Sequence, residues 1–157
     1  TAVPASALAG ALVPRPRAGC SGGSLAGAPN GMLPEASLCP LWGTAGQVLR
    51  ADAAAAFDEL SHAYAVETGE PLCVTDSYRD YAEQVAVRAA KPTLAAVPGR
   101  SNHGWGVALD LCGGVQQFGS PAHRWMQEHA AASGWFHPSW AEPGGSKPEP
   151  WHWEFAG

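Results

Sequence analysis

The pattern of apolar and polar positions predicts a first long helix near residue 50. Residues 50–68 are rich in strong helix formers and place Phe57, Leu60 and Tyr64 on one stripe at helical spacing. Gly69 follows this stripe directly, and glycine is the usual residue just beyond a helix end. We therefore expect one helix here, packed on a core through its apolar stripe.

Further along, the pattern predicts short strands and helices in irregular order. The expected elements are a strand at 71–78, a helix at 79–90, a glycine-rich loop, a strand at 107–112, a helix at 121–132 and a strand at 151–155. Ser120 and Pro121 are typical of a helix start, and Gly134 of its end. Because regular βαβ alternation is missing, we expect an α+β fold with a small, mainly antiparallel sheet flanked by helices.

The composition indicates an arm followed by one domain. The chain has 157 residues and is 46% apolar, which is enough for a single core. Residues 1–30 are mainly Ala, Gly, Pro and Ser, and such a segment buries too little apolar surface to offset its ordering entropy. We expect a linker or loosely held arm at 1–30 and the folded domain at 31–157.

Charge and hydropathy exclude two classes of partner. The formal net charge is -5, whereas nucleic-acid binding needs a clustered positive face. No apolar run approaches the ~20 residues of a membrane-spanning helix, so we expect no transmembrane segment. The chain begins at Thr1 without a charged and then apolar leader, which we interpret as a processed or trimmed chain.

Four cysteines, Cys20, Cys39, Cys73 and Cys112, are present in the chain. None forms a CxxC pair, so their spacing does not fit a zinc ribbon. Two disulfides in an exported protein are favoured over four buried thiols. We expect Cys20–Cys39, which would tie the arm to the domain, and Cys73–Cys112, because neighbouring strands would carry both residues.

The strongest chemical signal is the segment SNHGWGVALD at residues 101–110. In the predicted strand, Asp110 lies on the face opposite an apolar triplet that belongs in the core. His103 hangs from the loop that feeds this strand, and Gly104 and Gly106 allow the loop to turn sharply. Two ligands from one loop and strand, with a third from far along the chain, are a common zinc arrangement.

A third candidate ligand comes from WHWEF near the end of the chain. We expect Trp151, Trp153 and Phe155 to be buried on one face of a strand, which aims His152 rigidly from the other face. Glu149 stands three residues earlier with a proline on each side, so a stiff turn should present it.

Histidine, aspartate and histidine with an open fourth position are typical of a hydrolytic zinc site, and a free carboxylate beside them can accept a proton. We therefore predict one zinc per chain, bound by His103, Asp110 and His152. The alternative is that the aspartate caps a loop and the last histidine is a core residue. Solvated, capping or loop-end roles are expected for the other four histidines, His62, His123, His129 and His137.

These motifs resemble those of the zinc D-Ala-D-Ala carboxypeptidases and dipeptidases of the VanY and VanX kind. SNHGWGVALD fits their SxHxxGxAxD signature, EPWH supplies their ExxH, and DSYRDYAEQ is similar to the stretch that precedes the signature in VanY-like enzymes. The resemblance covers roughly residues 45–157. It implies a hedgehog/DD-peptidase-like fold and a catalytic domain at 31–157.

The resemblance also implies a role for each motif residue. The zinc ligands would be His103, Asp110 and His152. Glu149 would be the general base, and Arg79 would clamp the scissile carbonyl and the peptide end. Ser101 would hydrogen-bond the substrate, and Gln84 would help to hold its C-terminal residue.

Two of these roles have structural alternatives, and one residue departs from the family pattern. Arg79 could be a helix-start arginine paired with Asp76 or Asp80, and Gln84 could lie on a solvated helix face. Glu154 stands where many relatives have a basic or neutral residue. It could orient the neighbouring zinc-binding histidine, or it could be a rim charge that alters substrate preference.

The function implied by the resemblance is zinc-dependent D,D-carboxypeptidase activity on peptidoglycan stem peptides, by an extracytoplasmic bacterial monomer. An L,D-carboxypeptidase or an endolysin-type endopeptidase on the same scaffold remains open. A zinc-stabilised binding module, like the signalling domain of hedgehog proteins, would lack the base or the arginine, but Glu149 and Arg79 are both present. A cell-wall anchoring module would show repeats or an aromatic ladder, and neither is visible.

Overall fold

The computed structural model describes residues 20–157, in which three α-helices surround two antiparallel sheets. The helices are α2 (Ala51–Thr68), α3 (Tyr81–Ala90) and α4 (Pro121–His129). The strands are β1 (Leu38–Pro40), β2 (Val48–Arg50), β3 (Val74–Asp76), β4 (Ala108–Leu111), β5 (Trp135–Phe136) and β6 (His152–Phe155). Short 3-10 turns are η1 (Glu35–Ser37), η2 (Asn102–Trp105), η3 (Ala130–Ser133) and η4 (Ser139–Ala141). Residues 1–19 of the predicted arm lie outside the described residues.

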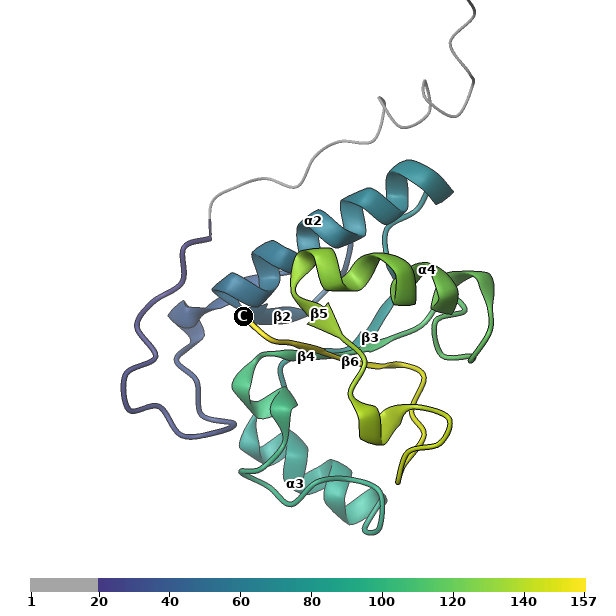
Figure 1. The fold of residues 1–157 in the computed structure, drawn as a ribbon. Helices are drawn as coiled ribbons and strands as arrows, with labels where there is room; N and C mark the ends of the chain where they lie inside the picture. Colours follow the sequence, from purple (N-terminus) through teal and green to yellow (C-terminus); the bar gives the residue numbers. More distant parts are fainter. Residues whose placement is uncertain (1–19) are drawn as a thin grey trace, which may run out of the picture.

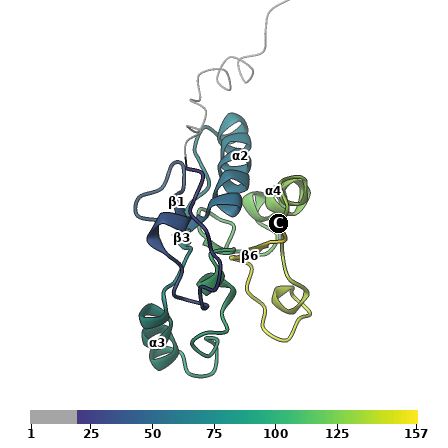
Figure 2. The same cartoon turned by 90° about the vertical axis from the view of Figure 1, so that its left-hand side faces the viewer.

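The larger sheet has the order β3-β4-β6-β5, with every neighbouring pair antiparallel. The helices α2 and α4 lie on one side of this sheet and α3 lies on the other (Figures 1 and 2). In the register of β4 and β6, Asp110 stands opposite His152. The predicted α+β class is confirmed, and so is the pairing of the two segments that carry candidate ligands.

The core lies between the sheet and α2. Because one face of β4 packs on this core, the candidate ligand on β4 must lie on the other face. Phe57 and Leu60 are buried as the helical stripe predicts, and Phe57 meets the ring of Trp135 edge to face at 6.4 Å. Leu109 and Trp153 are buried in the same cluster. Each such side chain contributes about 1.5–3 kcal/mol by leaving water, so strand alternation sends the polar residues of β4 and β6 to the opposite face.

Several element boundaries differ from the predicted ones for identifiable reasons. The prediction that a helix begins at Arg79 is wrong, because Asp80 is the N-cap and forms a capping box with Glu83, so α3 begins at Tyr81. The strand predicted at 71–78 shortens to β3, and the last predicted helix continues beyond α4 as η3. The β1–β2 hairpin and the two-residue strand β5 were not predicted.

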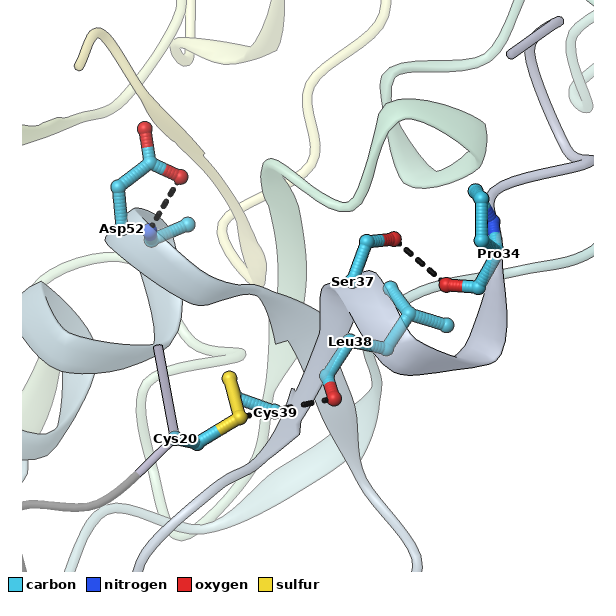
Figure 3. Close-up of a disulfide and its surroundings, with 7 residues drawn as sticks. Cys20, Pro34, Ser37, Leu38, Cys39 and Asp52 are labelled. Atoms are coloured by element: carbon cyan, nitrogen blue, oxygen red, sulfur yellow. Dashed lines mark hydrogen bonds between the residues drawn. A yellow bond between two sulfur atoms is a disulfide. The ribbon is translucent and has the colours of Figure 1, made fainter. Parts of the chain in front are cut away.

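Both predicted disulfides are confirmed. Cys20 bonds Cys39 at the start of the small sheet, and Cys73 bonds Cys112 beside β3 and β4. Figure 3 shows the first bond, with the sulfur of Cys20 also close to the Leu38 carbonyl at 3.7 Å. The segment between Cys20 and β1 is thereby tied to the domain at both of its ends.

Removing the first disulfide should lower stability measurably. In the chain-entropy description, a loop of about 20 residues contributes about 3 kcal/mol. We expect Cys20→Ser/Cys39→Ser to lower the free energy of unfolding by about that amount in guanidinium denaturation. Cys73→Ser/Cys112→Ser is the comparison, because its longer loop should cost about 4 kcal/mol. Unchanged denaturation midpoints in both pairs would contradict the expectation.

Candidate metal centre

Three side chains from two strands and a 3-10 turn converge on one point of the sheet. The His103 Nε2 atom lies 3.4 Å from Asp110 Oδ1, and the His152 Nδ1 atom lies 3.1 Å from the same oxygen. One donor atom from each residue lies within 4.8 Å of the others. The predicted convergence of these residues is therefore confirmed.

Hydrogen bonds and a glycine at its end fix the conformation of the loop that carries His103. Ser101 is the N-cap of η2, and its hydroxyl accepts a hydrogen bond from the His103 backbone at 3.3 Å. Gly106 ends the turn with a φ of 67°, and a Cβ there would lie 2.8 Å from the Arg50 nitrogen. The His103 Nδ1–H donates to the Ser77 carbonyl at 2.7 Å, so Nε2 is the ring nitrogen that faces Asp110 and is placed to bind a metal.

A carboxylate orients the second histidine in the same manner. His152 Nε2 lies 2.9 Å from Glu154 Oε1, while its Nδ1 faces Asp110. Hydrogen bonds to the outer nitrogen fix the ring plane and raise ligand basicity. Of the two alternatives for Glu154, this geometry matches the orienting one.

The charges of the centre suit metal binding. Burial acts to raise the pKa of Asp110, but hydrogen bonds from His103 and His152 outweigh it and hold the pKa well below its usual range. Burial acts to lower the pKa of His152, whereas its hydrogen bonds to Asp110 and Glu154 raise it to about 9. The aspartate is therefore ionised at neutral pH, as a metal ligand must be.

The donor set fits zinc. Two imidazole nitrogens and one carboxylate oxygen are the ligands of many hydrolytic zinc sites, which keep a fourth position open. Tetrahedral bonds of ~2.0–2.1 Å place donor atoms about 3.3 Å apart, close to the two separations given above. The three residues also line a cavity, so a zinc ion held by them would be accessible from that cavity.

The cavity beside the donors has a volume of about 300 Å³ and is bounded by α3, the segment after it, η2 and the turn before β6. Besides the three donors, the lining includes Arg79, Ser101, Trp140, Lys147, Glu149 and Trp151. The sequence-predicted residues of the site therefore gather around one cavity, with the exception of Gln84.

Glu149 is held in the cavity wall by its backbone and its side chain. Its N–H donates to the Ala141 carbonyl at 2.9 Å, and its carbonyl accepts from the His152 backbone at 3.1 Å. Its Oε1 lies 3.2 Å from Lys147 Nζ. The stiff turn predicted from the flanking prolines is thus reinforced by hydrogen bonds, which fix where this carboxylate lies.

Arg79 lies just before α3 with its guanidinium lining the cavity. It forms an ion pair with Asp76, as one of its structural alternatives expects, and its Nη1 donates to Gln84 Oε1 at 2.6 Å. Its Nη2 lies 3.9 Å from Asp110 Oδ2. Asp76 and Gln84 therefore orient the guanidinium of Arg79 towards the candidate metal position.

Gln84 is buried beneath the cavity wall. It is 2% exposed, so the alternative of a solvated helix face is wrong. Its Oε1 accepts from Arg79, and its Nε2 donates to the Ala96 carbonyl at 2.8 Å. Both ends of the amide are occupied by the protein, so this side chain links the arginine to the segment after α3.

The expectation that Trp151 is buried in the core is wrong. Trp151 is 36% exposed and lines the cavity, whereas Trp153 is buried. The strand begins only at His152, so Trp151 belongs to the preceding turn and escapes strand alternation. Two aromatic rings, those of Trp140 and Trp151, therefore border the cavity.

Sequence reasoning missed one histidine beside the candidate base. His137 Nε2 lies 2.8 Å from the Glu149 carbonyl, and His137 Nδ1 lies 3.0 Å from Glu142 Oε1. The ring therefore supports the backbone of the turn that presents Glu149. No spacing signal could have found it, because the contact joins residues in an irregular loop.

The fold, the three converging donors and the adjacent carboxylate are those of a zinc peptidase scaffold. The family model described as "VanY: D-alanyl-D-alanine carboxypeptidase" matches residues 46–157. The chain therefore belongs to the VanY D-alanyl-D-alanine carboxypeptidase family.

Individual relatives agree with this assignment. A D-alanyl-D-alanine carboxypeptidase of Enterococcus faecalis (strain ATCC 700802 / V583) is 34% identical over 74 residues, or 45% of this chain and 28% of the relative's length. VanYB in complex with D-Ala-D-Ala is 25% identical with a TM-score of 0.61, covering 76% of this chain and 77% of that one. A VanB-type VanY variant in complex with Zn(II) is 26% identical with a TM-score of 0.58, covering 76% and 78%.

The L,D-carboxypeptidase DacB of Streptococcus pneumoniae is also similar. It is 26% identical with a TM-score of 0.54, and the match covers 69% of this chain and 67% of that one. The scaffold is therefore shared by carboxypeptidases of both stereochemical preferences.

Proposed function

We propose that this protein is a zinc-dependent D,D-carboxypeptidase that hydrolyses the terminal D-Ala–D-Ala bond of peptidoglycan stem peptides. The convergence of His103, Asp110 and His152 beside a cavity that also presents Glu149 carries the proposal. Membership of the VanY family and the likeness to VanYB in complex with D-Ala-D-Ala support the substrate class.

Each residue of the site has a proposed task. His103, Asp110 and His152 would hold a zinc ion, which would supply Lewis-acid chemistry at the scissile carbonyl and would lower the pKa of water to about 7. Glu149 accepts the proton of the attacking water and passes it to the leaving amine, so it acts first as base and then as acid. The ion pair with Lys147 and the backbone hydrogen bonds hold its carboxylate in the cavity wall.

The substrate is oriented by the residues around the donors. The Arg79 guanidinium would stabilise charge that develops on the carbonyl oxygen, and Ser101 would hydrogen-bond the peptide. Gln84 would act through Arg79, because the side-chain amide oxygen of Gln84 accepts a hydrogen bond from one guanidinium N–H. Positioning of this kind raises the rate by fixing the reacting atoms in a productive geometry.

The lining of the cavity favours an exopeptidase over an endopeptidase. The Lys147 Nζ atom lies 2.5 Å from the Leu94 carbonyl and above the Trp140 ring at 5.1 Å, so it joins two walls of the cavity. Lys91 and Arg100 also line it and supply positive charge. Cavity walls that are bridged in this way and carry cations suit the free carboxylate of a peptide terminus better than a peptide chain that continues beyond the cavity.

An L,D-carboxypeptidase is the second candidate, supported by the likeness to DacB. Mass spectrometry of purified muropeptides before and after incubation separates the two activities. A D,D-carboxypeptidase shortens pentapeptide stems by one D-alanine and leaves tetrapeptide stems intact. Shortening of tetrapeptides alone would assign the L,D activity, and cleavage inside the stem would assign an endopeptidase.

Blocking the substrate's terminal charge should slow the reaction strongly. We expect a peptide with an amidated D-Ala terminus to show kcat/KM about 10²-fold below that of the free acid, because the cavity cations lose their anionic partner. Steady-state assays of the two peptides at equal zinc provide the measurement. Equal turnover would favour the endopeptidase alternative.

The proposed location is outside the cytoplasm. Two disulfides are typical of proteins that fold in oxidising compartments, and both are present here. Within residues 20–157, no helix has the length and apolar character needed to cross a membrane. We propose that residues 31–157 act as a monomeric catalytic domain with one zinc ion.

A further inference from the structure

A turn in the arm ahead of η1 reaches the loop that carries His103. The Met32 N–H donates to the Pro29 carbonyl at 3.0 Å and closes a β-turn in which Gly31 has a φ of 76°. Asn30, at the second position of this turn, is 7% exposed. Figure 2 shows the segment descending along the molecule to the region of α3 before it returns to β1.

Two hydrogen bonds join the turn to the loop at residues 101–104, which carries His103, and a third joins it to the start of α3. Asn30 Nδ2 donates to the Ser101 carbonyl at 2.7 Å, and the Gly31 N–H donates to the Gly104 carbonyl at 2.8 Å. The Tyr81 N–H donates to the Gly31 carbonyl at 2.8 Å. The turn therefore joins both ends of the segment around His103 to the start of α3.

The absence of a side chain at Gly104 leaves space for the Asn30 side chain. A Cβ at Gly104 would lie 2.1 Å from Asn30 Oδ1 and 3.0 Å from the Gly31 nitrogen. Gly104 does not have a positive φ, so its backbone conformation does not require glycine. The signature SxHxxGxAxD also leaves this position free. Space for the Asn30 side chain and the Gly31 backbone is the physical reason for the glycine.

We propose that Asn30 is a positioning residue for the metal centre. It holds the Ser101–Gly104 loop so that His103 Nε2 faces Asp110 and His152. The inference rests on the proposed function, because it takes His103 as a zinc ligand. Asn30 precedes residues 46–157, so the role lies outside the family match.

The first test measures zinc affinity in two Asn30 variants of the full chain with its disulfides intact. Asn30→Ala removes the donor, and Asn30→Asp keeps the shape but places a second acceptor against the Ser101 carbonyl. We expect both to weaken zinc binding about 10-fold in competition with a chromogenic chelator, the scale of other outer-shell substitutions. Wild-type zinc affinity in both variants, with only the melting temperature lowered, would overturn the proposal.

A double-mutant cycle tests the contact itself. Gly104→Ala should weaken zinc binding in the wild-type background, because the new methyl collides with Asn30 Oδ1. In the Asn30→Ala background that collision disappears, so the same substitution should weaken zinc binding by a smaller factor. Equal factors in the two backgrounds would overturn the proposal.

Ser37→Ala is the matched control in the same segment. The buried Ser37 hydroxyl donates to the Pro34 carbonyl at 2.6 Å, so its hydrogen bond stays within the segment between Cys20 and β1 (Figure 3). We expect a lower melting temperature with unchanged zinc affinity. Zinc binding weakened as much as in Asn30→Ala would mean that general loosening of the segment between Cys20 and β1 is the cause, and would overturn the specific role.

Failure of this inference and failure of the proposed function give different results. If His103→Ala keeps its zinc, the ligand assignment is wrong. If His103→Ala loses zinc while Asn30→Ala and Asn30→Asp bind it normally, the ligand assignment stands and only the positioning role is overturned.

Discussion

His103→Ala should lose zinc and fall to the background activity of metal-free protein. The Nε2 atom of His103 is one of the three donor atoms of the centre, and its loss leaves a zinc ion with two protein ligands, which is too few. Metal analysis after reconstitution and gel filtration, together with kcat/KM on a D-Ala-D-Ala peptide, provides the measurement.

The same variant should lose the stability that zinc confers. Binding to the folded state alone stabilises it by about 2.7 kcal/mol at a zinc concentration 100 times the Kd. Melting temperatures of the wild-type protein should therefore rise with added zinc, and those of His103→Ala should not. This zinc-dependent increment separates metal loss from the packing defect that removal of a buried ring causes by itself.

His129→Ala is the matched control, because His129 lies on α4 with its Nδ1 bonded to the Trp125 carbonyl, outside the cavity. It should keep zinc, the zinc-dependent rise in melting temperature, and activity. A His103→Ala protein that retains stoichiometric zinc and wild-type turnover would contradict the assignment of the metal centre.

The sheet and the metal centre could be predicted because strand alternation is a local rule. In β4 the apolar residues face the core under α2, which by itself directs Asp110 to the other face. The same rule aimed His152 correctly. It failed for Trp151, which stands one residue before the ladder and faces the cavity.

The supporting contacts could not be predicted because they join segments that are far apart in the sequence and irregular in structure. Asn30 contacts Ser101 across 71 positions, from a segment whose composition indicates only a loose arm. His137 supports Glu149 from one loop to another. Such contacts depend on how turns pack against each other, and the hydrophobic periodicity of the sequence carries no information about that packing.

Glu149→Gln should reduce kcat by about 10²–10⁴-fold, the usual contribution of positioned proton transfer. The amide keeps the shape of the side chain and can hydrogen-bond water, but it cannot accept the proton of the attacking water. KM should change little, because the base acts on the transition state more than on the bound peptide. Steady-state kinetics on a D-Ala-D-Ala peptide, with zinc content measured on the same samples, test this expectation.

Glu149→Ala completes the test, because it separates a base from a fourth ligand. Zinc content and melting temperature should remain close to wild type, since the three donors are His103, Asp110 and His152. Glu128→Gln, on the exposed side of α4, is the control and should be fully active. Loss of zinc in Glu149→Ala would make Glu149 a ligand and the site closed and structural. Near-full activity of Glu149→Gln would move the base elsewhere, with Glu154 the next candidate because it also lines the cavity.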